Sequence, residues 1–132
     1  MRAALRWCGA VAVGVAAFEG LDLAASRVPI LSWLTLASPF AAGAAAAWSA
    51  GPGIVSPLLA AAAVPWARIG VDRAVGMLRG VALPPEIGPL VIAFFGVSWT
   101  GMSVGAGAAV AVARRVAGRA ARGRASTAAP RA

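Results

Sequence analysis

The sequence predicts an all-α, polytopic integral membrane protein with about four transmembrane helices in an up-down bundle. Composition is the first observation: 61% of the 132 residues are hydrophobic and 12% are charged, about half the charged fraction of a typical soluble domain. A chain this small has too much surface for its volume to bury all its apolar side chains. The excess apolar surface is therefore expected to face lipid.

Two long stretches without charge are the second observation. Residues 28–67 contain no charged side chain, and neither do residues 87–113. One span takes about 20 residues, so the first stretch holds two helices, divided at Ala50-Gly51-Pro52-Gly53, where glycine and proline disfavour helix. With the apolar N-terminal segment, we predict four spans, at residues 6–26, 30–49, 53–70 and 87–112.

Two of these spans have alternatives. Residues 1–18 also fit a secretory signal, with a charged start and an apolar run, but Phe18-Glu19 interrupts the small-residue pattern of a cleavage site, which favours an uncleaved span. In the third span the apolar part after the break is short and contains Pro57 and Pro65. A re-entrant segment at residues 54–66 is the alternative there, and it would place the C-terminal tail outside the cell.

The remaining segments are predicted from their patterns. Residues 71–83 place apolar side chains on one helical face and charged ones on the other, as an interfacial amphipathic helix does, and Pro84-Pro85 ends that helix. Residues 117–132 are small, polar and basic without apolar periodicity, so we expect a disordered basic tail. The membrane domain is therefore expected to cover residues 1–116.

The third observation is the placement of the 12 basic residues, all of them arginine, against four acids. Positive residues collect on cytoplasmic flanks. With both termini in the cytoplasm, eight arginines are cytoplasmic and four external: Arg27, Arg68, Arg73 and Arg79. We therefore predict a multi-pass protein of the cell (inner or plasma) membrane with both termini cytoplasmic. The arginines flank apolar runs, so the expected partner is the lipid bilayer and not nucleic acid. The richness in alanine, glycine and arginine is typical of a GC-rich bacterial genome.

Several kinds of chemistry find no support. The chain has no histidine and a single cysteine, Cys8. It therefore lacks the commonest general base and metal ligand and cannot form an internal disulfide. No serine has a histidine or lysine to activate it. We expect neither an enzyme nor a cofactor or metal centre.

Glu19 and Asp22 form the first candidate site. Three residues apart, they share one helical face. An ionisable side chain at membrane depth is costly and is by default a functional hypothesis, here a site for a cation or a proton. The other interpretation is that the span ends early and both acids lie in the outer headgroup region, where Arg27 neutralises one of them.

Small residues at four-residue spacing form the second candidate site, a helix-packing face. One ridge lies in the fourth span (Gly101, Gly105, Ala109 and Ala113) and another in the second (Ser38, Ala42, Ala46 and Ala50). Small residues let two helix backbones approach closely in lipid. A ridge therefore indicates either an interface with a second copy or a larger membrane protein, or packing within the same bundle.

One segment resembles a known family. Residues 47–55, Ala-Trp-Ser-Ala-Gly-Pro-Gly-Ile-Val, resemble the Trp-Ser-Gly-x-Gly stretch of the small multidrug resistance transporters, four-helix proteins with a glutamate in the first span, which Glu19 would match. The resemblance implies a transporter. Pro52 interrupts the motif, and about 29 residues between Glu19 and Trp48 leave no room for the family's intervening span. The family's functional residues are therefore not carried over.

These patterns favour a non-enzymatic membrane subunit or scaffold that packs through small-residue helix faces. The alternative is a small transporter or channel component that uses Glu19 and Asp22. A transporter requires both acids inside the bilayer and facing a cavity, whereas a scaffold requires the glycine ridge to face outward.

Overall fold

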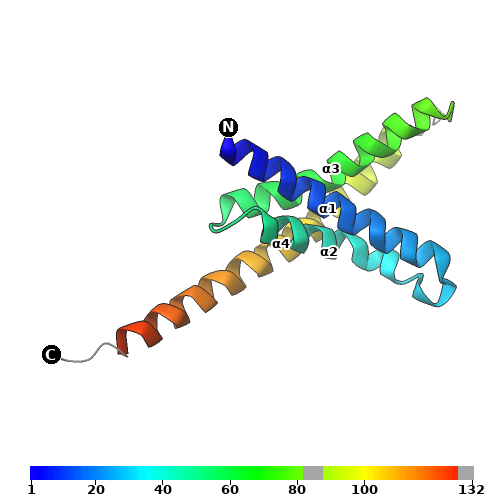
Figure 1. The fold of residues 1–132 in the computed structure, drawn as a ribbon. Helices are drawn as coiled ribbons and strands as arrows, with labels where there is room; N and C mark the ends of the chain where they lie inside the picture. Colours follow the sequence, from blue (N-terminus) through cyan, green and yellow to red (C-terminus); the bar gives the residue numbers. More distant parts are fainter. Residues whose placement is uncertain (82–87, 128–132) are drawn as a thin grey trace.

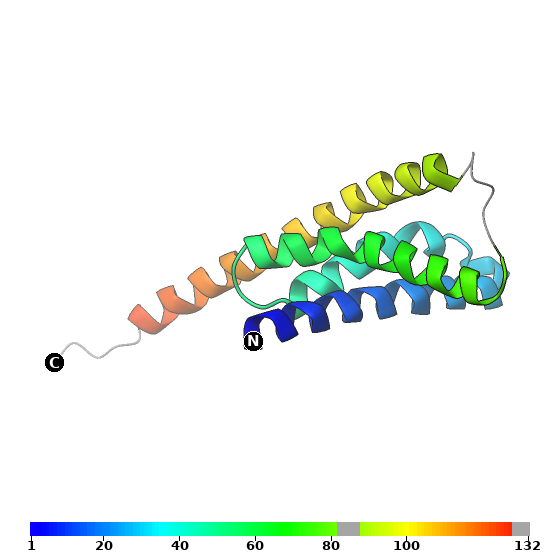
Figure 2. The same ribbon diagram turned by 90° about the horizontal axis from the view of Figure 1, so that it is seen from above.

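The computed structural model describes residues 1–81 and 88–127, and over these residues the chain is helical and contains no strand. The elements are α1 (Arg2–Arg27), the short 3-10 helix η1 (Pro29–Leu31), α2 (Leu34–Ser49), α3 (Val55–Leu78) and α4 (Gly88–Thr127). They pass each other at oblique angles (Figure 1). Figure 2 shows that they run alternately up and down, so that the start of α1 and the C-terminal end of α4 lie on the same side. The predicted all-helical class is confirmed, and two helices, α1 and α4, are long and apolar enough to cross a membrane.

The predicted break between the second and third helices is present. α2 ends at Ser49 and α3 begins at Val55. Between them, Gly51 and Gly53 have φ angles of +99° and +117°, a region that glycine enters without the clash of a Cβ atom. Pro57 follows in the first turn of α3, where a missing N–H leaves no hydrogen bond unmade.

The separate interfacial helix predicted at residues 71–83 is not present, because α3 continues without interruption through Leu78. No proline follows Pro65 within this helix. Arg68 and Asp72, one turn apart, form an ion pair at 3.3 Å across the predicted boundary, and such i,i+4 pairs favour helix. The end predicted at Pro84-Pro85 lies outside the described residues.

The disordered tail predicted from residue 117 is also corrected, since α4 continues to Thr127. Alanine and arginine, which dominate residues 117–125, are among the strongest helix formers. Extending an existing helix also avoids the cost of nucleating a new one. At 1.5 Å per residue, the 40 residues of α4 measure about 60 Å, roughly twice the thickness of a hydrocarbon core. The orange to red end of α4 extends beyond the other helices (Figure 2). Residues 128–132 lie outside the described chain.

The core is built from small side chains around α2, which packs against α1, α3 and α4. The small-residue ridge of the second predicted span is buried along its whole length (Ser38, Ala42, Ala46 and Ala50). The backbones of α2 and α4 approach each other closely, because a Cβ atom added at Gly43 would lie 2.5 Å from the Cα atom of Ser103. Side chains this small allow helices to pack backbone against backbone.

Two serine hydroxyl groups form hydrogen bonds around Pro39, which is buried inside α2. Proline has no N–H to donate to the carbonyl one turn back, and the hydroxyl of Ser38 donates instead to the Thr35 carbonyl at 2.9 Å. The buried hydroxyl of Ser103, from α4, donates to the Pro39 carbonyl at 2.9 Å. Both bonds satisfy polar atoms in the core, and the second also joins α4 to α2.

Candidate functional site

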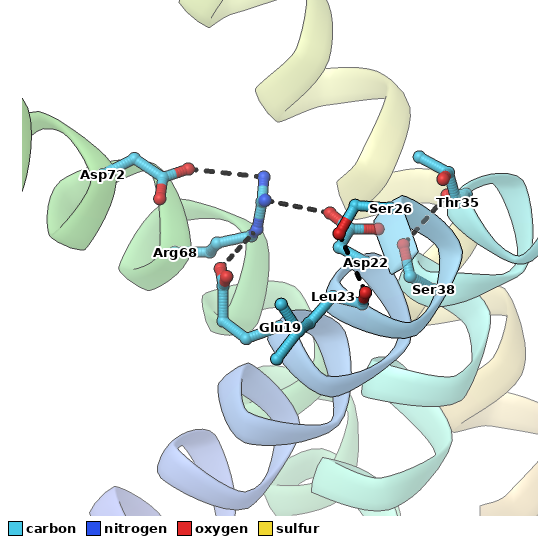
Figure 3. Close-up of polar contacts among 8 residues, drawn as sticks. All are labelled: Glu19, Asp22, Leu23, Ser26, Thr35, Ser38, Arg68 and Asp72. Atoms are coloured by element: carbon cyan, nitrogen blue, oxygen red, sulfur yellow. Dashed lines mark hydrogen bonds and ion pairs between the residues drawn. The ribbon is translucent and has the colours of Figure 1, made fainter. Parts of the chain in front are cut away.

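Three carboxylates from α1 and α3 surround the guanidinium group of Arg68 (Figure 3). Its Nε atom donates to Oε1 of Glu19 at 2.8 Å and its Nη2 atom to Oδ2 of Asp22 at 2.9 Å. Its Nη1 atom lies 3.3 Å from Oδ2 of Asp72. Every nitrogen of the guanidinium group therefore faces a carboxylate, and we name these four residues the Arg68 cluster.

Helical spacing on two neighbouring helices assembles this cluster. Glu19 and Asp22 share one face of α1 because they are three residues apart, and Arg68 and Asp72 share one face of α3 because they are four apart. The sequence pattern placed the two α1 acids together, but it offered Arg27 as their partner. The structure pairs them with Arg68. The available signal was that Arg68 is the first charge after 40 uncharged residues and stands one turn before Asp72.

Aromatic rings enclose the guanidinium group from the bundle side. Its carbon atom lies 4.4 Å from the ring centre of Phe18 and 5.1 Å from that of Trp99, and the two rings meet edge to face. A guanidinium group is attracted to the face of an aromatic ring, most strongly where water is excluded. The Arg68 side chain is only 14% exposed, so the rings and carboxylates together replace most of its hydration.

The cluster carries more negative than positive charge. Three carboxylates share one guanidinium group, a formal excess of two negative charges when all are ionised. Oδ1 of Asp22 is buried without a hydrogen-bond partner, and buried carboxylate oxygens ordinarily have one. The arrangement has the charge and an acceptor atom without a hydrogen-bond partner, which suit the binding of a proton. Among the described residues, no group of histidine, cysteine and acidic side chains is placed to bind a metal ion.

Asp72 is the member of the cluster that lies beyond the apolar part of α3. Asp72 lines a cavity of about 320 Å³ between α3 and α4, whose other walls include Phe95 and Trp99. The cluster therefore borders a mostly apolar cavity on one side.

The second candidate site, the ridge on α4, faces away from the bundle. Gly101, Gly105, Ala109 and Ala113 are all exposed, and a Cβ atom added at either glycine would meet nothing within 4 Å. The face of α4 that packs inward carries Ser103, Gly107 and Ala111, all buried. Sequence reasoning missed this inward face because alanine and glycine occur on every side of the helix.

Comparison of the chain with protein-family models, with curated proteins and with solved structures finds no match.

Proposed function

We propose that the chain is a small, non-enzymatic, multi-pass membrane protein that acts as a subunit or scaffold through the outward face of α4. The observation that carries this proposal is the exposed ridge of Gly101, Gly105, Ala109 and Ala113. The partner is a second copy of the chain or a larger membrane protein. A ridge that already packed inside the bundle would leave no such contact to make.

Large apolar side chains continue this face toward both ends of α4. They are Leu90, Phe94 and Val97 before the ridge and Val112 and Val116 after it, each between 56% and 75% exposed. Their spacing of three, four and seven residues keeps them on one side of the helix. A helix face with small side chains in the middle and large side chains at both ends lets a second helix approach closely at the middle. The second helix can then pack against the large side chains on either side.

The lengths of α1, α3 and α4 are sufficient for crossings of the membrane, whereas α2 by itself is shorter than a hydrocarbon core. At 1.5 Å per residue, α1 and α3, with 26 and 24 residues, measure about 39 and 36 Å, and a hydrocarbon core is about 30 Å thick. α2 has 16 residues, about 24 Å, and η1 precedes it. Arg68 would lie at membrane depth, where its three carboxylate partners lower the cost of its charge.

The membrane topology is tested with reporter fusions at Ala132 and Pro84. We propose that both termini are cytoplasmic, as the distribution of arginine favours, so the reporter at Ala132 should be cytoplasmic and the one at Pro84 external. A C-terminal tail outside the cell would contradict the four-span arrangement and would favour a re-entrant segment at residues 54–66.

The scaffold role is tested by replacing Gly105 with isoleucine. A branched side chain at the centre of the ridge would hold a partner helix away, but it meets nothing within the chain itself. We expect crosslinking in native membranes to show loss of the oligomer or partner complex, with the thermal stability of the monomer in detergent unchanged. Gly20→Ile is the matched control, because Gly20 on α1 is equally open. Equal losses in both variants would contradict an interface specific to α4.

A transporter or channel component using Glu19 and Asp22 is the second candidate function. The unpartnered Oδ1 atom of Asp22 favours it. We expect Glu19→Gln to accumulate and insert normally, because removing a charge lowers the cost of insertion. Cation or proton flux is then measured in vesicles. If Glu19→Gln abolishes the flux and Gly105→Ile leaves it intact, the transporter is favoured over the scaffold.

A further inference from the structure

A second charged site lies where α2 turns into α3, at the end of the bundle that holds the start of α1. A cavity of about 340 Å³ opens there, lined by Gly53 of the turn and by three arginines of α4, Arg114, Arg115 and Arg122. Arg115 and Arg122 are seven residues apart, which places them two turns apart on the same face of α4. We call this cavity the basic pocket.

Arg114 is held in place by the turn itself. Its Nη1 atom donates to the carbonyl oxygens of Trp48 at 2.8 Å and Gly51 at 3.2 Å, and its guanidinium carbon lies 4.5 Å from the ring centre of Trp48. The carbonyls at a helix C-terminus need such donors, because the helix supplies none. The wall of the basic pocket is therefore positioned by contacts that form on folding.

Among the described residues, no acidic side chain lies at this end of the molecule. The three acids in the described chain all belong to the Arg68 cluster, and the sequence has no acid after Glu86. Arg6 adds a further positive charge from α1, because its side chain lies 3.4 Å from the position a Cβ atom at Gly51 would take. Clustered guanidinium groups without counter-charges attract anions, and their planar donors match phosphate oxygens.

We propose that the basic pocket binds the phosphate of an anionic phospholipid headgroup, in the leaflet on the side of the two termini. The proposal rests on the membrane location proposed above. Lipid is favoured over a free anion because the pocket stands where the apolar part of α4 passes into its basic extension. Val112 and Val116, which follow Ala111 and Arg115 of the pocket lining in the sequence, are exposed. Basic pockets at the cytoplasmic ends of membrane helices bind anionic headgroups in this way.

The test compares two double variants of the full-length protein in vesicles of phosphatidylcholine containing increasing phosphatidylglycerol. Arg115→Gln with Arg122→Gln removes two charges from the pocket, whereas Arg2→Gln with Arg119→Gln removes two charges outside its lining. Arg2 and Arg119 are exposed and do not line the pocket. Arg114 is left intact because it supports the turn.

We expect the native protein and the Arg2/Arg119 variant to retain phosphatidylglycerol in preference to phosphatidylcholine, measured by native mass spectrometry. Retention by the Arg115/Arg122 variant should be weaker by on the order of tenfold. If both variants lose phosphatidylglycerol equally, the lipid is attracted by the overall positive charge and not by the basic pocket, which would overturn the proposal. Inorganic phosphate that stabilises the native protein in pure phosphatidylcholine as strongly as phosphatidylglycerol does would overturn the assignment to lipid.

Extraction at alkaline pH separates this proposal from the membrane location on which it rests. A native chain that washes off the membrane would contradict the location itself. A chain that stays in the membrane but shows no preference for phosphatidylglycerol would overturn the lipid site alone.

Discussion

The close contact between α2 and α4 makes Gly43 the position at which one added methyl group should matter most. A Cβ atom there would overlap the backbone oxygen of Ser103 and lie 2.5 and 2.6 Å from its Cα and carbonyl carbon. Backbone atoms cannot rotate away as a side chain can. Ordinary contact begins at 3.4 Å, so Gly43→Ala would force α2 and α4 apart by about 1 Å, a separation at which packing attraction is substantially reduced.

The expected magnitude follows from three effects. Overpacking of a tight interior costs about 1–3 kcal/mol. Separation of the helices also stretches the 2.9 Å bond from the Ser103 hydroxyl to the Pro39 carbonyl, which contributes about 1 kcal/mol. Alanine is favoured over glycine in a helix by about 1 kcal/mol, which opposes the other two. The free energy of unfolding should therefore fall by about 1–3 kcal/mol.

Thermal unfolding in mild detergent, followed by far-UV circular dichroism, measures this change. Gly20→Ala is the matched control, since Gly20 is also within a helix but has nothing within 4 Å of an added Cβ atom. It should be neutral or slightly stabilising. If Gly43→Ala proves as stable as Gly20→Ala, the contact between α2 and α4 is not as close as the structure places it, and the packing argument for the core fails.

Two further predictions concern the charged groups. Arg68→Gln should lower the free energy of unfolding by about 3 kcal/mol, since it strands three carboxylates, whereas Arg73→Gln should change it little; equal detergent melting curves would contradict the cluster's structural role. Arg114→Gln should speed limited proteolysis at the turn between α2 and α3 relative to Arg115→Gln, because it removes two hydrogen bonds to turn carbonyls; identical cleavage rates would show that the turn holds without them.

Features that depend on a few adjacent residues could be predicted from the sequence. The helical class follows from composition and from apolar stretches of suitable length. The break between α2 and α3 follows from Gly51 and Gly53, which reach φ angles that other residues avoid. The sharing of one face by Glu19 and Asp22 follows from helix geometry alone. Each of these is a property of the local backbone, so no knowledge of the neighbouring helices was needed.

Two helix ends could not be predicted in the same way. Polarity was taken to end the third span after residue 70, with a separate helix to follow, and to end helical structure after residue 116, but α3 and α4 both continue. Polarity governs where a helix meets water, and it does not end a helix whose residues favour helical backbone. The i,i+4 pair of Arg68 and Asp72 stabilises the first continuation, and alanine and arginine favour the second.

Only the tertiary structure shows which arginine pairs with Glu19 and Asp22 and which face of α4 packs against the other helices. The choice of Arg68 over Arg27 for Glu19 and Asp22 depends on how α3 lies against α1, across 46 and 49 residues of sequence. The burial of Ser103 and exposure of Gly105 depend on the rotation of α4 about its own axis. Composition cannot set that rotation in a helix with small residues on every side. It follows from the fit between Gly43 and Ser103 and from the hydrogen bond that Ser103 gives to Pro39.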